Sequence, residues 1–109
     1  CVFKTETAVS AFQQYQGLSD RKKIAPGQGM LFLFKDAADR VFVMRRMHFP
    51  LDIIFIRNHR VINLYHNLPP EGKKPTISYH SGGSADAVLE IPAGQAYACR
   101  LGVGSEISW

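Results

Sequence analysis

Apolar residues along the chain gather in short runs separated by turn-forming residues. Two of these runs, residues 29–34 and residues 53–56, are apolar at every position. Runs of this length between turn signals are typical of strands that are covered on both faces. We therefore predict that both runs are strands in the core of a β-rich domain built around residues 44–56.

Capping and turn signals predict the elements of the N-terminal part. Residues 2–5 favour a short opening strand. Residues 8–15 favour a helix that begins at a Thr7 cap and ends at Gly17. At most one helical turn is expected over residues 18–24, because a Pro-Gly breaker follows them.

Two hairpins are predicted in the middle of the chain. The β-forming segment 40–44 follows the first apolar run after a five-residue turn at residues 35–39. The second hairpin pairs a strand at residues 51–56 with residues 61–65 through a turn at Asn58.

The C-terminal part is rich in proline and glycine. Residues 67–75 favour an exposed loop, residues 81–86 a flexible link, and residues 93–100 a helix that stops before Gly102. Three short strands complete the prediction: residues 76–79, 87–91 and 107–109. About seven short strands with two short helices predict a mainly β (α+β) fold, a small, partly closed β-barrel in a single domain over residues 1–109.

The composition is that of an ordinary globular domain, with 46% apolar and 20% charged residues among 109. No apolar run approaches the roughly 18 to 20 residues that a membrane span needs. The net charge of +4 favours acidic partners in general, but the basic residues are scattered and no nucleic-acid motif accompanies them. We expect no membrane span and no nucleic-acid partner, with a monomer as the default state.

The two cysteines, Cys1 and Cys99, leave their redox state open. They fit one disulfide, two free thiols or no pairing, because the sequence gives no distance between them. A chain that begins with cysteine rather than methionine indicates a processed or trimmed N-terminus. We do not expect a lipid on Cys1, because β-forming residues follow it without a polar linker.

No metal or cofactor site is predicted. The four histidines never occur at a metal-ligand spacing; they are His48, His59, His66 and His80. The glycine pairs at 27/29 and 102/104 do not form a phosphate-binding loop.

Three polar residues are candidates for chemistry. Asp52 directly precedes the second apolar run, so its carboxylate must be solvated, hydrogen-bonded or paired. It either accepts backbone or arginine hydrogen bonds that fix the strand entry, or serves as a ligand contact or general base. Strand alternation places Glu90 opposite its apolar neighbours, where solvent exposure explains it equally well. His48 lies among polar residues, and Asp52 with Glu90 would form an acid pair if both faced one cleft.

Five short motifs occur together in the order and spacing of domain-of-unknown-function family 192, which the chain resembles over nearly its whole length. The motifs are Gly17-Leu18-Ser19-Asp20-Arg21, Gly29-Met30-Leu31-Phe32, Phe42-Val43-Met44, Pro50-Leu51-Asp52-Ile53-Ile54-Phe55-Ile56 and Leu89-Glu90-Ile91-Pro92-Ala93-Gly94. The resemblance implies a small β-barrel-like fold with short helices and an unassigned biochemical role. Because such proteins often follow an export signal in bacteria and archaea, it also favours an exported location, periplasmic or extracellular.

The chain departs from this family pattern at two places. Members usually show Met-Lys-Asn-Thr before the Pro-Leu-Asp segment, where this chain has Met44 followed by Arg45, Arg46 and Met47. They also tend to have an arginine where this chain has Gln16. If the Asn-Thr pair lines a pocket in the family, that pocket is altered here.

The leading hypothesis is a non-enzymatic ligand-binding or accessory module with a cleft between Met44 and Asp52, where an anionic small molecule or glycan would suit Arg45 and Arg46. The predicted site residues are Arg21, Met44, Arg45, Arg46, His48, Asp52 and Glu90. One alternative is a small hydrolase-like enzyme that uses Asp52, Glu90 or His48. Another is an interaction domain that presents the proline-rich loop 68–75 to a protein.

Overall fold

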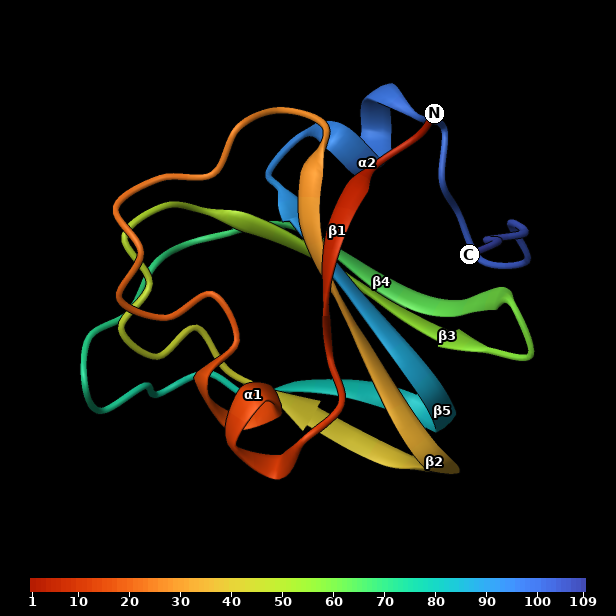
Figure 1. The fold of residues 1–109 in the computed structure, drawn as a ribbon, viewed down its shortest axis with the longest axis horizontal. Coiled ribbons are helices and arrows are strands. Elements are labelled where there is room, and N and C mark those ends of the chain that lie inside the picture. The colour runs from red at the N-terminus through yellow and green to blue at the C-terminus, as the bar shows by residue number, and fades with distance from the viewer.

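The chain forms five strands and two short helices in the computed structural model, which describes residues 1–109 (Figure 1). They are β1 Lys4–Ala8, α1 Ala11–Gln16, β2 Gln28–Phe42, β3 Leu51–Arg57, β4 Arg60–Leu68, β5 Tyr79–Pro92 and α2 Gln95–Ala98. The strands form one sheet in the order β1-β2-β5-β3-β4, in which β1 and β2 are parallel and the other pairs antiparallel. A mainly β fold with two short helices is therefore confirmed. The sheet has five strands rather than seven and is open at β1 and β4, so the partly closed barrel is not confirmed.

The strand count differs because β2 and β5 are long strands that pair over most of their length. The predicted turn at residues 35–39 and the predicted link at residues 81–86 lie opposite each other, with Asp39 beside Ser84. Register shifts in this part of the ladder absorb the extra residues as bulges. The two segments, which have the composition of turns, thus pair with each other as strands. The predicted first hairpin is therefore wrong, because residues 28–42 form one continuous strand.

The second hairpin, between β3 and β4, forms as predicted. Both residues of its turn, Asn58 and His59, have positive φ angles of 48° and 62°. Asparagine adopts this left-handed conformation more readily than most residues, and a turn of this kind matches the twist of the strands.

Helix α1 begins three residues later than predicted because Ser10, not Thr7, caps it. Ser10 Oγ accepts a hydrogen bond from the Gln13 N–H (3.1 Å), and Gln13 Oε1 accepts one from the Ser10 N–H (3.0 Å). This reciprocal pair is a capping box. Thr7 remains in β1, whereas Gly17 ends the helix as predicted.

The C-terminal predictions are confirmed only in part. Helix α2 lies inside the predicted range 93–100, but residues 107–109 add no strand, and the nearest pairing is a single bridge between Glu106 and Arg60. Neither helix is long and apolar enough to cross a membrane.

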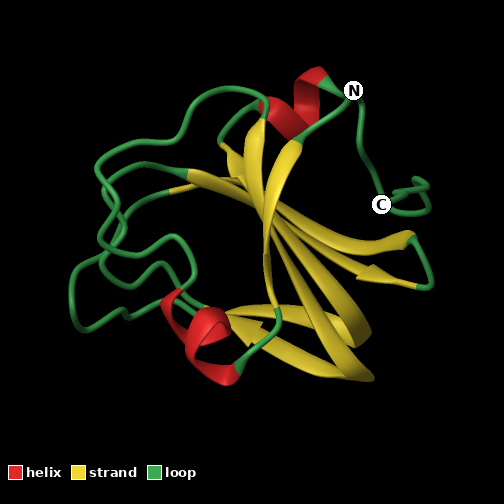
Figure 2. Ribbon diagram, viewed as in Figure 1, coloured by secondary structure: helices red, strands yellow, loops and turns green.

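Strand β3 is buried on both faces and divides the core in two. Residues 51–56 are fully buried, as the apolar pattern predicts for this scaffold. Leu51, Ile53 and Phe55 contribute to a cluster of 13 buried residues on the side covered by the connecting loops, which we call the loop face. Ile54 and Ile56 belong to a cluster of 8 on the side of α2, which we call the α2 face. Figure 2 shows the loops gathered on one side of the strands, with α2 and both termini on the other.

Candidate functional site

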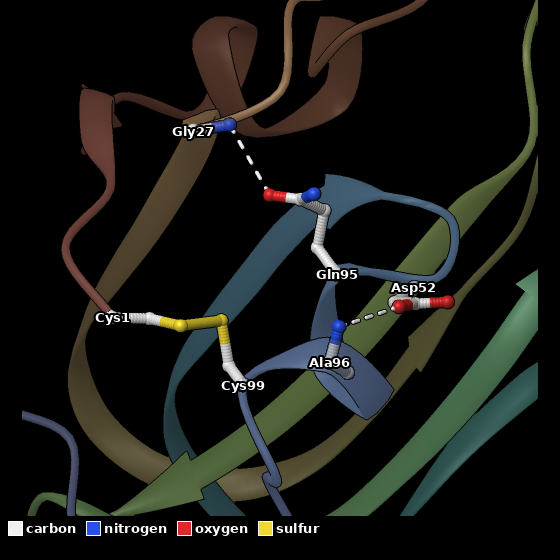
Figure 3. The surroundings of a disulfide bond; sticks show 6 residues. All are labelled: Cys1, Gly27, Asp52, Gln95, Ala96 and Cys99. Carbon is white, nitrogen blue, oxygen red and sulfur yellow. Dashed lines mark hydrogen bonds between the residues drawn. A yellow bond between two sulfur atoms is a disulfide. The ribbon is translucent and has the colours of Figure 1, made fainter.

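Asp52 lies on the α2 face, where its carboxylate is fully buried. It accepts hydrogen bonds from the backbone N–H groups of Asn67 (2.8 Å), Gly94 (3.0 Å) and Ala96 (2.9 Å), the last of which Figure 3 shows. These bonds join β3 to the end of β4 and to the start of α2. The geometry therefore fits the structural interpretation of Asp52, with backbone groups rather than arginine as its partners.

Replacing this carboxylate tests that role. We expect Asp52→Asn to lower the free energy of unfolding by about 3 kcal/mol, because the amide NH₂ faces backbone donors and leaves at least one of them unpaired. Asp39→Asn is the matched control: Asp39 is exposed, so its replacement should change stability by less than about 0.5 kcal/mol. Urea unfolding measures both, and equal effects would contradict the structural role.

Glu90 lies on the loop face, so the two carboxylates are on opposite sides of the sheet. Its neighbours in the register are Met30 of β2 and Ile53 of β3, both in the loop-face cluster. The orientation predicted from strand alternation is correct, but Glu90 is only 5% exposed, so exposure does not explain it. An acid pair of Asp52 and Glu90 in one cleft is not formed.

The Glu90 carboxyl accepts no hydrogen bond from the protein. Burial raises its pKa from 4.5 to about 8, and no charged neighbour or donor opposes that shift. The side chain reaches Gly17, where a Cβ atom would lie 3.6 Å from Glu90 Oε1 and 3.3 Å from Phe32 Cζ. Acids perturbed in this way concentrate at functional sites. Of the two buried carboxyl groups, Glu90 is therefore the stronger candidate for a functional role.

Three connecting segments, residues 17–21, 44–47 and 71–72, are fastened together over the loop face, and we call them the loop bundle. Ser19 Oγ donates to the Arg45 carbonyl (2.7 Å), and the Asp20 N–H donates to the Arg46 carbonyl (2.8 Å). The Arg46 N–H in turn donates to the Gly72 carbonyl (3.0 Å). The proline-rich loop is mostly exposed, as predicted, and is also held to the other two segments.

The three arginines of the predicted site have different partners. Arg21 forms an ion pair with Glu6, which lowers the pKa of that glutamate through its hydrogen bonds. Arg45 lies over the Tyr15 ring at 4.0 Å and donates to the Tyr15 carbonyl (2.9 Å). Arg46 has only a distant ion pair with Asp20, at 3.7 Å, and 43% of its side chain is exposed. Of the three, Arg46 therefore has the weakest contact of its guanidinium with the protein.

The remaining predicted site residues do not share a cleft. Met44 is fully buried in the loop-face core, and His48 is exposed. Met44 and Glu90 lie on the same face, with Arg21, Arg45 and Arg46 on segments that cover it, whereas Asp52 lies beneath α2. The structure therefore does not bring Asp52, Glu90 and His48 together as a hydrolase would require.

A cavity of about 670 Å³ lies on the α2 face, away from the loop bundle. Its lining includes Leu31 and Leu89, together with Phe3, Leu101 and Ile107 from the terminal segments. Its polar lining includes the exposed Arg100 and Glu106, and it contains no buried polar side chain without a partner. The sequence does not mark these residues, because apolar lining residues resemble core residues.

Cys1 and Cys99 form a disulfide, one of the alternatives that the sequence leaves open. The bond joins the segment before β1 to the residue that ends α2 (Figure 3). Gln95 Oε1 also accepts a hydrogen bond from the Gly27 N–H (3.2 Å). Helix α2 is thus tied to the segments that precede both β1 and β2.

Comparison with known proteins agrees with this fold. The model of DUF192, described as "Uncharacterized ACR", matches residues 1–109. The chain belongs to DUF192. Two solved structures resemble it: a "putative transcription regulator" from Sinorhizobium meliloti 1021 and a protein of unknown function from Novosphingobium aromaticivorans. The first is 28% identical with a TM-score of 0.88, and the match covers 95% of this chain and 79% of the matched chain. The second is 33% identical with a TM-score of 0.90, and the match covers 98% of this chain and 75% of the matched chain. No curated protein matches.

Two of the DUF192 motifs meet at the Glu90 carboxyl. The motif at residues 17–21 supplies Gly17 beside it and part of the loop bundle, and the motif at residues 89–94 supplies Glu90 itself. Arg46 and Met47, where the resemblance implies a departure from the family, lie in the same bundle. Motif order in the sequence identifies the family, but the contact between Gly17 and Glu90 is visible only in the folded chain.

Proposed function

We propose that this DUF192 protein is a non-enzymatic binding domain that takes a small anionic ligand, such as an acidic sugar or glycan, at the loop bundle. The observation that carries the proposal is the Arg46 side chain, which is 43% exposed and has no closer ionic contact than 3.7 Å. Its backbone is held on both sides by the neighbouring segments of the bundle. A guanidinium on a fixed backbone is suited to paired hydrogen bonds with an oxyanion.

The surrounding charge supports an anion. Exposed lysines follow two of the bundle segments directly in the chain: Lys22, Lys23, Lys73 and Lys74. Asp20 and Glu71 are the acidic residues of the bundle; Oε1 of Glu71 accepts hydrogen bonds from Thr76, whereas Oε2 is buried without a partner. The separation of Asp52, Glu90 and His48 favours binding over acid–base catalysis.

The disulfide supports the exported location that the family resemblance favours. Disulfides form and persist mainly in oxidising compartments such as the periplasm and the extracellular space. The Cys1–Cys99 bond joins two residues 98 positions apart, as a structural bridge does. We include an exported location in the proposal.

Thermal-shift titration with matched sugars tests the ligand class. We expect glucuronate, glucose 6-phosphate or glucose 6-sulfate to raise the unfolding temperature in a saturable manner, and glucose to have no effect. Arg46→Ala should weaken binding at least about tenfold, because it removes a charge-assisted hydrogen bond. Arg57→Ala, an exposed arginine at the end of β3, should leave binding unchanged. Stabilisation by none of the three anions, or equal loss in both variants, would refute the proposal.

A further inference from the structure

We propose that the Glu90 carboxyl, as a neutral acid, donates a hydrogen bond to the oxyanion of the ligand. This inference rests on the proposed function, since it assigns a second contact to the same anion. Glu90 lies on the face that the loop bundle covers, is 5% exposed and has no hydrogen-bond partner in the protein. A ligand atom is the partner that this carboxyl lacks.

The contact with Gly17 gives the direction of approach. Gly17 has a φ of +50°, and a Cβ at this position would meet both Glu90 Oε1 (3.6 Å) and the Phe32 ring (3.3 Å). Glycine therefore serves two purposes here, since it permits the backbone conformation and keeps a Cβ atom away from the carboxyl. Gly17 and Arg46 both belong to the loop bundle, so the ligand that we propose would reach Glu90 from this side.

No basic group of the protein is in a position to ionise Glu90. Its immediate neighbours across the sheet are Met30 and Ile53. The next residues out, Glu6 and Tyr65, are not basic, and Glu6 is already paired with Arg21. β5 itself places no titratable group beside it on this face. Of the charged groups on the covering segments, Arg45 lies over the Tyr15 ring, and Arg46 is an exposed residue with only a distant contact to Asp20.

These surroundings favour a donor over an acceptor role. Burial raises the pKa of Glu90 to about 8, so the carboxyl carries its proton at neutral pH and offers an O–H group. A cationic ligand would require the ionised form and would have to pass the basic loop bundle. An oxyanion meets a positive rim and a neutral acid, and both are favourable.

The pH dependence of binding tests the donor role. The affinity of wild-type protein for glucuronate, glucose 6-phosphate and glucose 6-sulfate is measured by calorimetry between pH 7 and pH 9, where the charge of these probes is constant. If the protonated acid donates, affinity should fall about tenfold across this range as Glu90 loses its proton. The three probes distinguish carboxylate, phosphate and sulfate as the preferred oxyanion.

Two replacements separate this role from a structural one. Glu90→Gln keeps an N–H donor, so we expect binding that no longer depends on pH, whereas Glu90→Leu should bind at least about tenfold more weakly. Glu106→Gln, an exposed glutamate, is the control and should retain the wild-type pH profile. An affinity that rises with pH, or a wild-type profile in Glu90→Gln, would refute the inference. If Arg46→Ala weakens binding while both Glu90 variants behave as wild type, only this inference fails; if no anion binds, both proposals fail.

Discussion

Removal of the Cys1–Cys99 disulfide should lower the free energy of unfolding by about 4 to 5 kcal/mol. The bond closes nearly the whole chain into one loop, with a sequence separation of 98. A cross-link over a loop of about 100 residues restricts the unfolded chain by roughly 4.7 kcal/mol. A loss of this size is a large fraction of the stability of a typical small domain, which is about 5 to 15 kcal/mol.

The double variant Cys1→Ala/Cys99→Ala measures this effect by urea unfolding, compared with wild-type protein under oxidising conditions. The loss should be greatest locally at β1, an edge strand that pairs only with β2, and amide hydrogen exchange should report its opening. A reducing agent should destabilise the wild type by a similar amount and leave the double variant unaffected. A difference below about 1 kcal/mol between the two proteins would contradict a stabilising role for the bond.

Glu90→Gln should raise the free energy of unfolding by about 3 kcal/mol at pH 7. The pKa of Glu90 is about 8 in the folded protein and 4.5 when it is freely solvated. The folded state therefore holds a proton that the unfolded state releases, and stability falls as pH rises from 4.5 towards 8. Each pH unit in this window costs about 1.4 kcal/mol, and glutamine avoids the cost because it does not ionise.

The stability advantage of Glu90→Gln should depend on pH in a defined way. It should vanish near pH 4, where both states bind the proton, and approach roughly 5 kcal/mol above pH 8. Urea unfolding at several pH values measures it, with Glu106→Gln as the exposed control. A wild-type protein whose stability is not lowered between pH 5 and pH 8 relative to Glu90→Gln would show that Glu90 ionises freely.

Together with Asp52→Asn, this variant separates the two buried acids by the sign of the effect. Asp52 accepts hydrogen bonds from three backbone donors, so its replacement should lower the free energy of unfolding. Glu90 accepts none, so its replacement by glutamine should raise that free energy. Groups that serve a site are often retained at a cost in stability. Opposite signs would therefore support a structural role for Asp52 and a functional one for Glu90.

Local signals predicted the elements whose partners lie nearby in the chain. The apolar residues of β3, the turn at Asn58 and the end of α1 at Gly17 follow from burial, turn geometry and glycine chemistry within a few residues. The pairing of β2 with β5 was missed because Asp39 and Ser84, which lie side by side in the sheet, are 45 positions apart. Their segments have the composition of turns, and only the long-range partner makes them strands.

The sequence predicts candidate residues but not how the folded chain arranges them. Strand alternation gave the face of Glu90 correctly, yet its burial depends on Gly17 and on loops that approach from elsewhere in the chain. Asp52 and Met44 are close to each other in the sequence, but Pro50 and the entry into β3 separate their surroundings, and Asp52 turns to the opposite face. The sequence pattern over residues 44–52 is the same for a segment that lines a cleft and for one that enters the core, so it does not distinguish the two.

The titration of Glu90 itself tests the central claim most directly. Carbon-13 NMR of the Glu90 carboxyl, assigned by comparison with Glu90→Gln, should give a pKa of about 8 in the free protein. Saturation with the tightest-binding of the three anionic sugars should raise that pKa further, because the bound oxyanion favours the protonated acid. A carboxyl that titrates near 4.5, or whose pKa is unchanged or lowered by the bound anion, would contradict the role assigned to Glu90.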